Sequence, residues 1–302
     1  MFKHSNFVEF TQSFGSDEQC YAYLSQVKWK NGYQCRKCKH EKFVKGRTWY
    51  YRKCQKCQYD ESCTSNTLFH KLKFPITKAF WIVYQVGTMK KGISTMEISR
   101  QFGIHQKTAW FFKRKIQQAI QDGGAAKLKD NVEVDETSIG GYEEGAPGRT
   151  HGKKNMVQVA IEIEYPLEST TEKAVIKNAG ATVIEGYSST DLSQGIEKML
   201  EPDLIITTDK WSAYPNAVGE RIHLQFKSDQ GQNFLKLHYH IFNLKNWIRG
   251  THHSVSTKHL QRYLDEYHYR FNRRNNILSC PSRLIARFMR TAWLPYSMAI
   301  GN

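Results

Sequence analysis

Residues 156–164 read MVQVAIEIE, and this stretch decides how the surrounding chain is organised. Apolar side chains occupy every second position in it, at Val157, Val159, Ile161 and Ile163. Alternation with a period of two predicts a β-strand that buries one face. The chain has 302 residues, which is enough for two or three domains, so we expect this strand to belong to one domain of several.

Further strand and helix patterns surround this strand. Strands are predicted at 132–139, 174–177, 204–208 and 221–226, a helix at 189–200, and mainly helices from about 233 to 288. Three successive strands, followed by alternating helix and strand, are the element order of the RNase H-like fold. We therefore predict an α/β layer sandwich with a mixed sheet.

Four of the seven cysteines form two pairs with close spacing. Their pattern is Cys35-x2-Cys38-x15-Cys54-x2-Cys57. Four thiolates suit tetrahedral Zn²⁺ and leave no open coordination position, so the predicted site is structural. Because so small a segment has little apolar core, it is expected to need Zn²⁺ in order to fold as a ribbon.

The segment from Gly92 to Trp110 fits a helix-turn-helix. A short helix after Ser94 or Thr95 is followed by a turn at Gly103 and a longer helix over 105–120. In that arrangement the residues expected to face a DNA groove are Gln106, Lys107, Thr108 and Lys113. The alternative is a plain pair of packed helices without DNA contacts.

The charge of the chain is +16 and is unevenly distributed. Residues 25–130 hold 23 Lys/Arg against 6 Asp/Glu, and residues 235–302 hold 11 against 2, whereas residues 131–234 hold 9 against 17. Basic blocks attract a polyanion, so nucleic acid is the expected partner. No apolar run is long enough for a membrane span or a signal peptide, which predicts a soluble intracellular protein.

Two aspartates belong to predicted strands of the acidic region, Asp135 within the first and Asp209 at the end of a later one. Asp135 follows Val132-Glu133-Val134, and Asp209 follows the apolar run that begins at Leu204. These strands are neighbours in an RNase H-like sheet, so both carboxylates are expected at one site, where oxygen ligands hold Mg²⁺ or Mn²⁺. Glu136 is expected to face the opposite side of its strand and not to be a ligand.

The chain resembles the DDE-superfamily transposases of bacterial insertion sequences, in the group with an ISXO2-like domain. The resemblance extends from about Tyr33 to Arg274. It rests on the runs VDETSIGG (134–141), TDKWSAY (208–214), NLKNWIRGTHH (243–253) and KHLQRYLDEYHYRFNRR (258–274). It implies that Asp135 and Asp209 are the first two members of a catalytic triad.

The third member of that triad, usually Glu, stands seven residues before a Lys in this group. Counting back from Lys245 gives His238, and seven residues place both on one helix face. The resemblance therefore implies His238 as the third member and Lys245 as a phosphate contact. Imidazole is a softer and less charged ligand than carboxylate, so a second metal would be bound differently. Asn243 lies on the same predicted helix but at a different spacing from Lys245.

The resemblance implies DNA cleavage by water at the ends of an element, followed by attack of the freed 3′-hydroxyl on target DNA. The implied partners are double-stranded DNA, as terminal inverted repeats and as target, and a second copy of the chain on DNA. The implied location is the cytoplasm of a bacterium, at the nucleoid. The expected segments are an N-terminal helical segment (1–24), a zinc ribbon (25–70), a helix-turn-helix domain (71–125), a catalytic domain (130–275) and a C-terminal tail (276–302).

Two other functions fit the same sequence. Loss of the glutamate would fit a decayed transposase that only binds DNA, and His238 is the feature that separates this reading from an active enzyme. An RNase H-like nuclease without strand transfer would need no binding specific to DNA ends.

Overall fold

The computed structural model describes residues 6–140, 154–164, 174–252 and 255–300, and it divides into two compact units. Unit 1 contains residues 1–123 and 276–302, and unit 2 contains residues 124–275. Each unit buries its own apolar side chains. Among the described helices, none combines the length and the apolar character that a bilayer crossing requires.

Unit 1 begins with two helices where the sequence predicted one. They are α1 (Phe7–Ser13) and α2 (Asp17–Lys28). The Ser16 side chain accepts a hydrogen bond from the Gln19 N–H, and the Gln19 side chain accepts one from the Ser16 N–H. This capping box begins a new helix, which explains why the predicted single helix is interrupted near Gly15.

The cysteine segment forms a small antiparallel sheet. Its strands are β1 (Phe43–Lys45), β2 (Tyr51–Cys54) and β3 (Asp60–Ser62), in the order β1-β2-β3. Most of the side chains on β1 and β2 are exposed or only half-buried. The ribbon therefore has little apolar core of its own, as its composition predicted.

Three further helices follow: α3 (Ile76–Thr88), α4 (Thr95–Phe102) and α5 (Gln106–Asp122). Ser94 caps α4, since its hydroxyl accepts a hydrogen bond from the Glu97 N–H, which confirms a cap at this position. Gly103 ends α4 in the left-handed region, at φ +58°, where a side chain would be strained. The short turn that follows leads directly into α5.

The last part of the chain completes unit 1. Helix α10 (Cys280–Arg290) packs on α3 and α5, and the short helix α11 (Tyr296–Ile300) lies against α5. The Arg287 guanidinium donates to the carbonyl groups of Ala119, Ile120 and Gly123 at the end of α5. These carbonyls have no partner within the helix, so Arg287 both caps α5 and complements its dipole.

Unit 2 is built on a mixed five-stranded sheet. Its strands are β4 (Asn131–Ile139), β5 (Asn155–Glu164), β6 (Val175–Ile184), β7 (Ile205–Thr208) and β8 (Ile222–Gln225). Their order is β6-β5-β4-β7-β8. The first three strands pair antiparallel, and β7 is parallel to both β4 and β8. The predicted mixed α/β architecture is confirmed.

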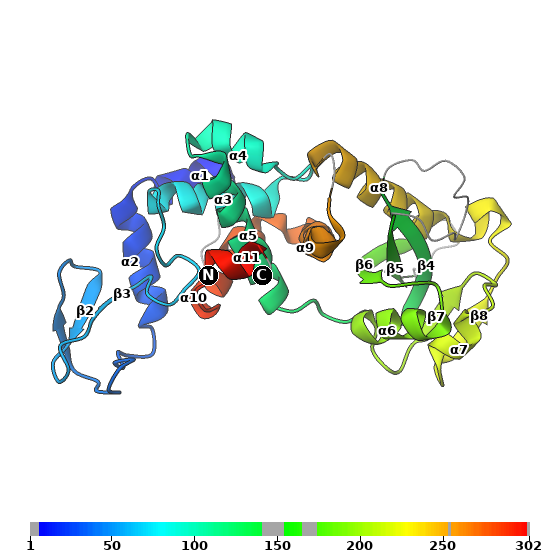
Figure 1. The fold of residues 1–302 in the computed structure, drawn as a ribbon, viewed down its shortest axis with the longest axis horizontal. Helices are drawn as coiled ribbons and strands as arrows, with labels where there is room; N and C mark the ends of the chain where they lie inside the picture. The colour runs from blue at the N-terminus through cyan, green and yellow to red at the C-terminus, as the bar shows by residue number, and fades with distance from the viewer. Residues whose placement is uncertain (1–5, 141–153, 165–173, 253–254, 301–302) are drawn as a thin grey trace. The chain divides into compact units, whose positions relative to one another are not determined.

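Helices cover both faces of this sheet (Figure 1). Helices α6 (Ser189–Met199) and α7 (Tyr214–Val218) pack on the face that carries Val132 and Val134. Helices α8 (Leu235–His252) and α9 (Thr257–Phe271) pack on the opposite face, over Val157, Val159 and Ile161. The 3₁₀ turns η1 (Asp229–Phe234) and η2 (Arg274–Ser279) precede α8 and α10. The site described below lies on the α8 face.

Strand β6 is longer than the four residues that the sequence predicted. Residues 178–182 contain asparagine, glycine and two alanines, which conceal the strand pattern. Among the described residues, strand β6 has no neighbouring strand on its outer edge, and side-chain amides bond its backbone there instead. The Gln261 amide accepts from the Val183 N–H and donates to the Ala181 carbonyl. The Asn272 amide accepts from the Ala179 N–H and donates to the Ala179 carbonyl. Tertiary contacts therefore extend the strand beyond its local propensity.

Two buried histidines join α8 to α9, and they predict a dependence of stability on pH. His268 donates from Nδ1 to the Leu264 carbonyl (2.7 Å), so its Nε2 is left to accept from Nε2 of His240 (3.1 Å). Burial lowers the pKa of His268 to about 4. The folded state therefore binds this proton less tightly than the unfolded state, and stability falls as the pH drops from about 6.5 towards 4.

We expect the free energy of unfolding of unit 2 to fall by about 2 kcal/mol from this residue alone between pH 7 and pH 5. Denaturant unfolding at both pH values, in wild type and His268→Gln, measures it. The variant should be less stable at pH 7 but should lose less stability on acidification. An equal loss in the two proteins would contradict the assignment.

Candidate active site and metal centre

The parallel pairing of β4 with β7 aligns two aspartates that are far apart in sequence. Asn131, Val132 and Glu133 stand opposite Ile205, Ile206 and Thr207. Asp135 and Asp209 each follow the last pair of this ladder by two positions, and Asp209 comes directly after the end of β7, where its Oδ1 accepts a hydrogen bond from the Trp211 N–H (3.0 Å). Alternation along β4 places Glu133 and Asp135 on the same face.

Asp135 contacts a histidine on the helix that covers this face. Its Oδ2 lies 3.3 Å from Nε2 of His238 on α8, while its Oδ1 accepts a hydrogen bond from the Glu136 N–H (2.8 Å). The bond from Asp135 raises the pKa of His238, and the negative charges of Asp135, Glu133 and Asp209 add to this effect. The site therefore stabilises positive charge at the position of the imidazole.

Residue 231, in the η1 turn, is a glycine, and the absence of a side chain there leaves room for the imidazole of His238. Gly231 has φ +89°, and a Cβ on it would come within 2.7 Å of Nδ1 of His238. Gly231 thus lets the imidazole ring lie between the η1 turn and Asp135. The ring orientation depends on both neighbours.

Glu133 is a residue of this site that the sequence reasoning missed. Burial raises the pKa of its carboxyl to about 7, against the opposing effect of His238. Its Oε2 is buried without a hydrogen-bond partner among the described residues. The signal was present in the sequence, because Glu133 is two positions before Asp135 in a strand of period two.

Lys245 lies on α8, seven residues after His238. Burial lowers the pKa of its ammonium, and so do the charges of Arg249 and Lys154, whereas the charge of Asp135 raises it. Lys245 is thus within electrostatic range of the carboxylates. Its exposed neighbours Asn243 and Asn246 lie on the solvent side of α8.

The other side of β4 carries a different set of contacts. Tyr214 of α7 is fully buried in the core that contains Val132 and Val134. Burial raises its pKa well above the ordinary value, and the negative charge of Glu136 adds to the shift. Glu136 is therefore close to the α7 side, as expected, and does not share the Asp135 face.

The acidic residues near His238 carry oxygen donors of the type that hard divalent cations prefer, and the charges of Glu133, Asp135 and Asp209 all stabilise a positive imidazole there. Oxygen ligands of this kind are those that Mg²⁺ and Mn²⁺ prefer. A bound cation would relieve the burial of negative charge that raises the pKa of Glu133. Among the described residues, the four ribbon cysteines are the only group of three or more potential ligands whose donor atoms lie within 4.8 Å of one another.

The four paired cysteines meet at one point in the ribbon. Their Sγ atoms all lie within 4.8 Å of one another, with Cys35–Cys57 and Cys38–Cys54 each 3.5 Å apart. Burial opposes ionisation of Cys35, but the backbone N–H groups of Cys38 and Lys37 outweigh it and lower its pKa. A thiolate is the form that binds metal, so the geometry fits a structural Zn²⁺ site.

Three of the four residues expected to face DNA lie at the start of α5. Lys107 is exposed, Thr108 is partly buried, and Gln106 donates to the Thr95 hydroxyl across the turn. The expectation for Lys113 is wrong. Its side chain is buried, and its Nζ donates to the Ile93 carbonyl (2.7 Å), because the position faces the segment that precedes α4 rather than solvent.

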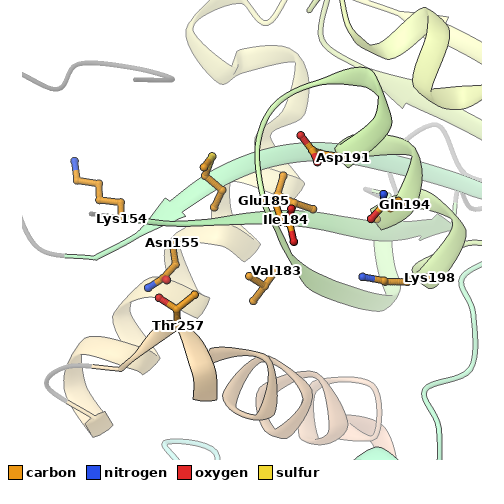
Figure 2. Close-up of a pocket in the computed structure, with 11 residues that line it drawn as sticks. Lys154, Asn155, Val183, Ile184, Glu185, Asp191, Gln194, Lys198 and Thr257 are labelled. Carbon is orange, nitrogen blue, oxygen red and sulfur yellow. The ribbon is translucent and has the colours of Figure 1, made fainter. Parts of the chain in front are cut away.

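Unit 2 also has a cavity of about 540 Å³ that is separate from these residues. Figure 2 shows side chains from the start of β5, the end of β6, helix α6 and the start of α9 around it. Lys154 and Lys198 are balanced there by Glu185 and Asp191. None of Asp135, Asp209, His238 and Lys245 lines this cavity, so it is not the candidate active site.

Similarity to known proteins follows the same division of the chain. Residues 127–272 match the ISXO2-like transposase domain, and residues 15–60 match the transposase zinc-ribbon domain. One similar protein, in Halobacterium salinarum, is described as an uncharacterized protein in the transposable element ISH50. It is 23% identical over 150 residues, which are 47% of this chain and 49% of that protein. The chain thus spans about half the length of this relative. A bacterial origin stays a prediction, because that organism is an archaeon.

Removing the ribbon's metal tests the cysteine site. We expect one Zn²⁺ per chain by elemental analysis, and loss of that Zn²⁺ in Cys54→Ser, because three ligands cannot close a tetrahedral site. Amide hydrogens of β1–β3 should then exchange rapidly. Cys63→Ser is the matched control, since Cys63 is equally buried but lies outside the cluster. Equal Zn²⁺ content in the two variants would overturn the site.

The contact between Asp135 and His238 predicts a titration shift. In buffer free of divalent ions, the imidazole pKa of His238 should be above its ordinary value and should fall towards it in Asp135→Asn, which removes the charge. NMR titration of the ring Cε1–H measures both values, with assignment by a His238→Gln variant. An unchanged pKa in Asp135→Asn would show that the contact does not persist in solution.

Proposed function

The chain belongs to the transposases that combine an ISXO2-like domain with an N-terminal zinc ribbon, and we propose that it cleaves and joins DNA by in-line displacement at phosphorus. The observation that carries this proposal is the contact between Asp135 and His238, with Asp209 directly after the strand that pairs parallel to β4. The sheet order β6-β5-β4-β7-β8, with helices on both faces, supports an RNase H-like domain. The substrate is double-stranded DNA, taken first as the ends of the element and then as target.

Each residue of the site has a distinct task in this proposal. Asp135 and Asp209 hold Mg²⁺ or Mn²⁺, which when bound stabilises the attacking and leaving oxygens. His238, kept in place by Asp135 and by the space at Gly231, is the third member of the triad. Lys245 contacts a phosphate of the bound strand as a point charge. Glu133 contributes negative charge from beneath Asp135.

Different segments of the chain contact different parts of the DNA in this proposal. The ribbon and the α4–α5 pair recognise the terminal inverted repeats, with Zn²⁺ acting only as a structural support. The basic segment after residue 235 holds the strand backbone. Since both ends of an element must be cut and joined together, the active form on DNA is at least a dimer.

Metal-dependent nicking of end DNA tests this proposal. Wild-type protein should nick a duplex bearing the element's terminal repeat in Mg²⁺ or Mn²⁺, and Asp135→Ala should lose at least a hundredfold in rate, because a carboxylate ligand is gone. Asp203→Ala is the matched control: this exposed aspartate precedes β7 but is not aligned with β4. Gel analysis of the labelled strand reads out the reaction.

The outcomes separate the three functions. Equal nicking by wild type and Asp135→Ala would contradict the assignment of the site. Specific binding of the repeat without nicking by wild type would indicate a decayed transposase that only binds DNA. Nicking without preference for the repeat in a gel shift would indicate a nuclease rather than a transposase.

A further inference from the structure

Unit 1 contains a cavity of about 350 Å³ beside the amino-terminal turn of α5. Four lysines line it: Lys71, Lys73, Lys107 and Lys115. None of the described residues that line it is Asp or Glu. The cavity therefore attracts negative charge, and it differs in this from the cavity of unit 2, where two lysines face two carboxylates (Figure 2).

Aromatic rings form the wall of this cavity. The ring centroids of Phe111 on α5 and Tyr296 on α11 lie 5.3 Å apart at 71°, and Phe74 also lines the cavity. Tyr296 is 40% exposed, so part of its ring remains open to a ligand. Aromatic faces of this kind bind flat rings by stacking.

One of the four lysines is hydrogen-bonded to the backbone of unit 1, and the other three are exposed to solvent. Nζ of Lys115 donates to the carbonyl groups of Leu68 (2.8 Å) and His70 (3.1 Å), so it fixes the cavity floor. Lys71, Lys73 and Lys107 are exposed. Nζ of Lys107 lies 5.1 Å from the ring centroid of Tyr296, which places positive charge and an aromatic face at the same opening.

This combination narrows the class of ligand. A phosphate alone would use the lysines and leave the aromatic wall without a partner. A paired base in a duplex presents only its edges, because its faces are stacked between neighbours. A nucleotide whose base has left the stack offers both a flat ring and a phosphate, as single strands do when they bind aromatic platforms beside basic groups.

We propose that this cavity binds one unpaired nucleotide of the DNA, with its base against Tyr296 and Phe111 and its phosphate at Lys71, Lys73 and Lys107. The inference rests on the proposed function, in that it takes DNA as the substrate. It adds to that function a preference for DNA that is locally unpaired next to the segment held by α5.

The experiment compares two labelled duplexes of identical sequence, one fully paired and one with a single unpaired nucleotide, by fluorescence anisotropy with the full-length zinc-loaded protein. We expect the wild type to bind the second duplex about tenfold more tightly. Tyr296→Ala should abolish this difference and leave binding of the paired duplex unchanged. The double variant Lys71→Gln/Lys73→Gln should reduce the salt dependence of binding to the unpaired form.

Met298→Ala is the matched control, because Met298 is 60% exposed on the same helix and does not line the cavity. It should keep the full preference. Equal affinity of the wild type for the two duplexes would overturn the inference, and so would a preference that survives in Tyr296→Ala. Nicking of end DNA without any such preference would overturn this inference alone, whereas a protein that binds neither duplex would overturn the proposed function as well.

Discussion

The pairing of β4 with β7 is the constraint on which the candidate active site depends. Glu133 and Thr207 are more than seventy positions apart in sequence and become direct neighbours only in this parallel ladder. A parallel pair requires a crossover, which here includes β5, β6 and α6. A one-residue slip of register would turn Asp135 or Asp209 to the other face of the sheet, away from His238. The apolar cluster beneath Val132, Val134 and Ile206 therefore fixes the chemistry as well as the fold.

What could be predicted from the sequence was set by local pattern. The alternation at 156–164, the cap at Ser94 and the spacing of Cys35 and Cys38 each involve interactions within a few residues, and the structure has a strand, a helix start and a close pair of cysteines there. The long course of β6 could not be predicted, because side chains of a distant helix complete its edge.

Two residues show that local pattern does not predict burial: one was wrongly expected to contact DNA, and the other was overlooked. Lys113 has a residue type suited to phosphate, but its side chain is buried and donates to the carbonyl of Ile93, in the segment before α4, and no spacing rule reports that contact. Glu133 was overlooked although its position two residues before Asp135 was visible, because its significance comes from its burial and from the nearby charge of His238. Local pattern thus places residues on a face, whereas packing decides which faces are open.

Under the proposed function, the charge distribution would separate DNA recognition from the chemical step. Residues 131–234 carry an excess of eight acidic groups, and Glu133, Asp135 and Asp209 lie within it, so this region repels a phosphate backbone by itself. The flanking segments, 25–130 and 235–302, carry excesses of 17 and 9 basic groups and can supply the attraction. A divalent cation at the carboxylates would reverse the local sign where the scissile phosphate must approach. The proposed binding of DNA and its proposed cleavage should then respond differently to ions: monovalent salt would weaken the basic contacts by screening, whereas divalent ions would act at the acidic residues.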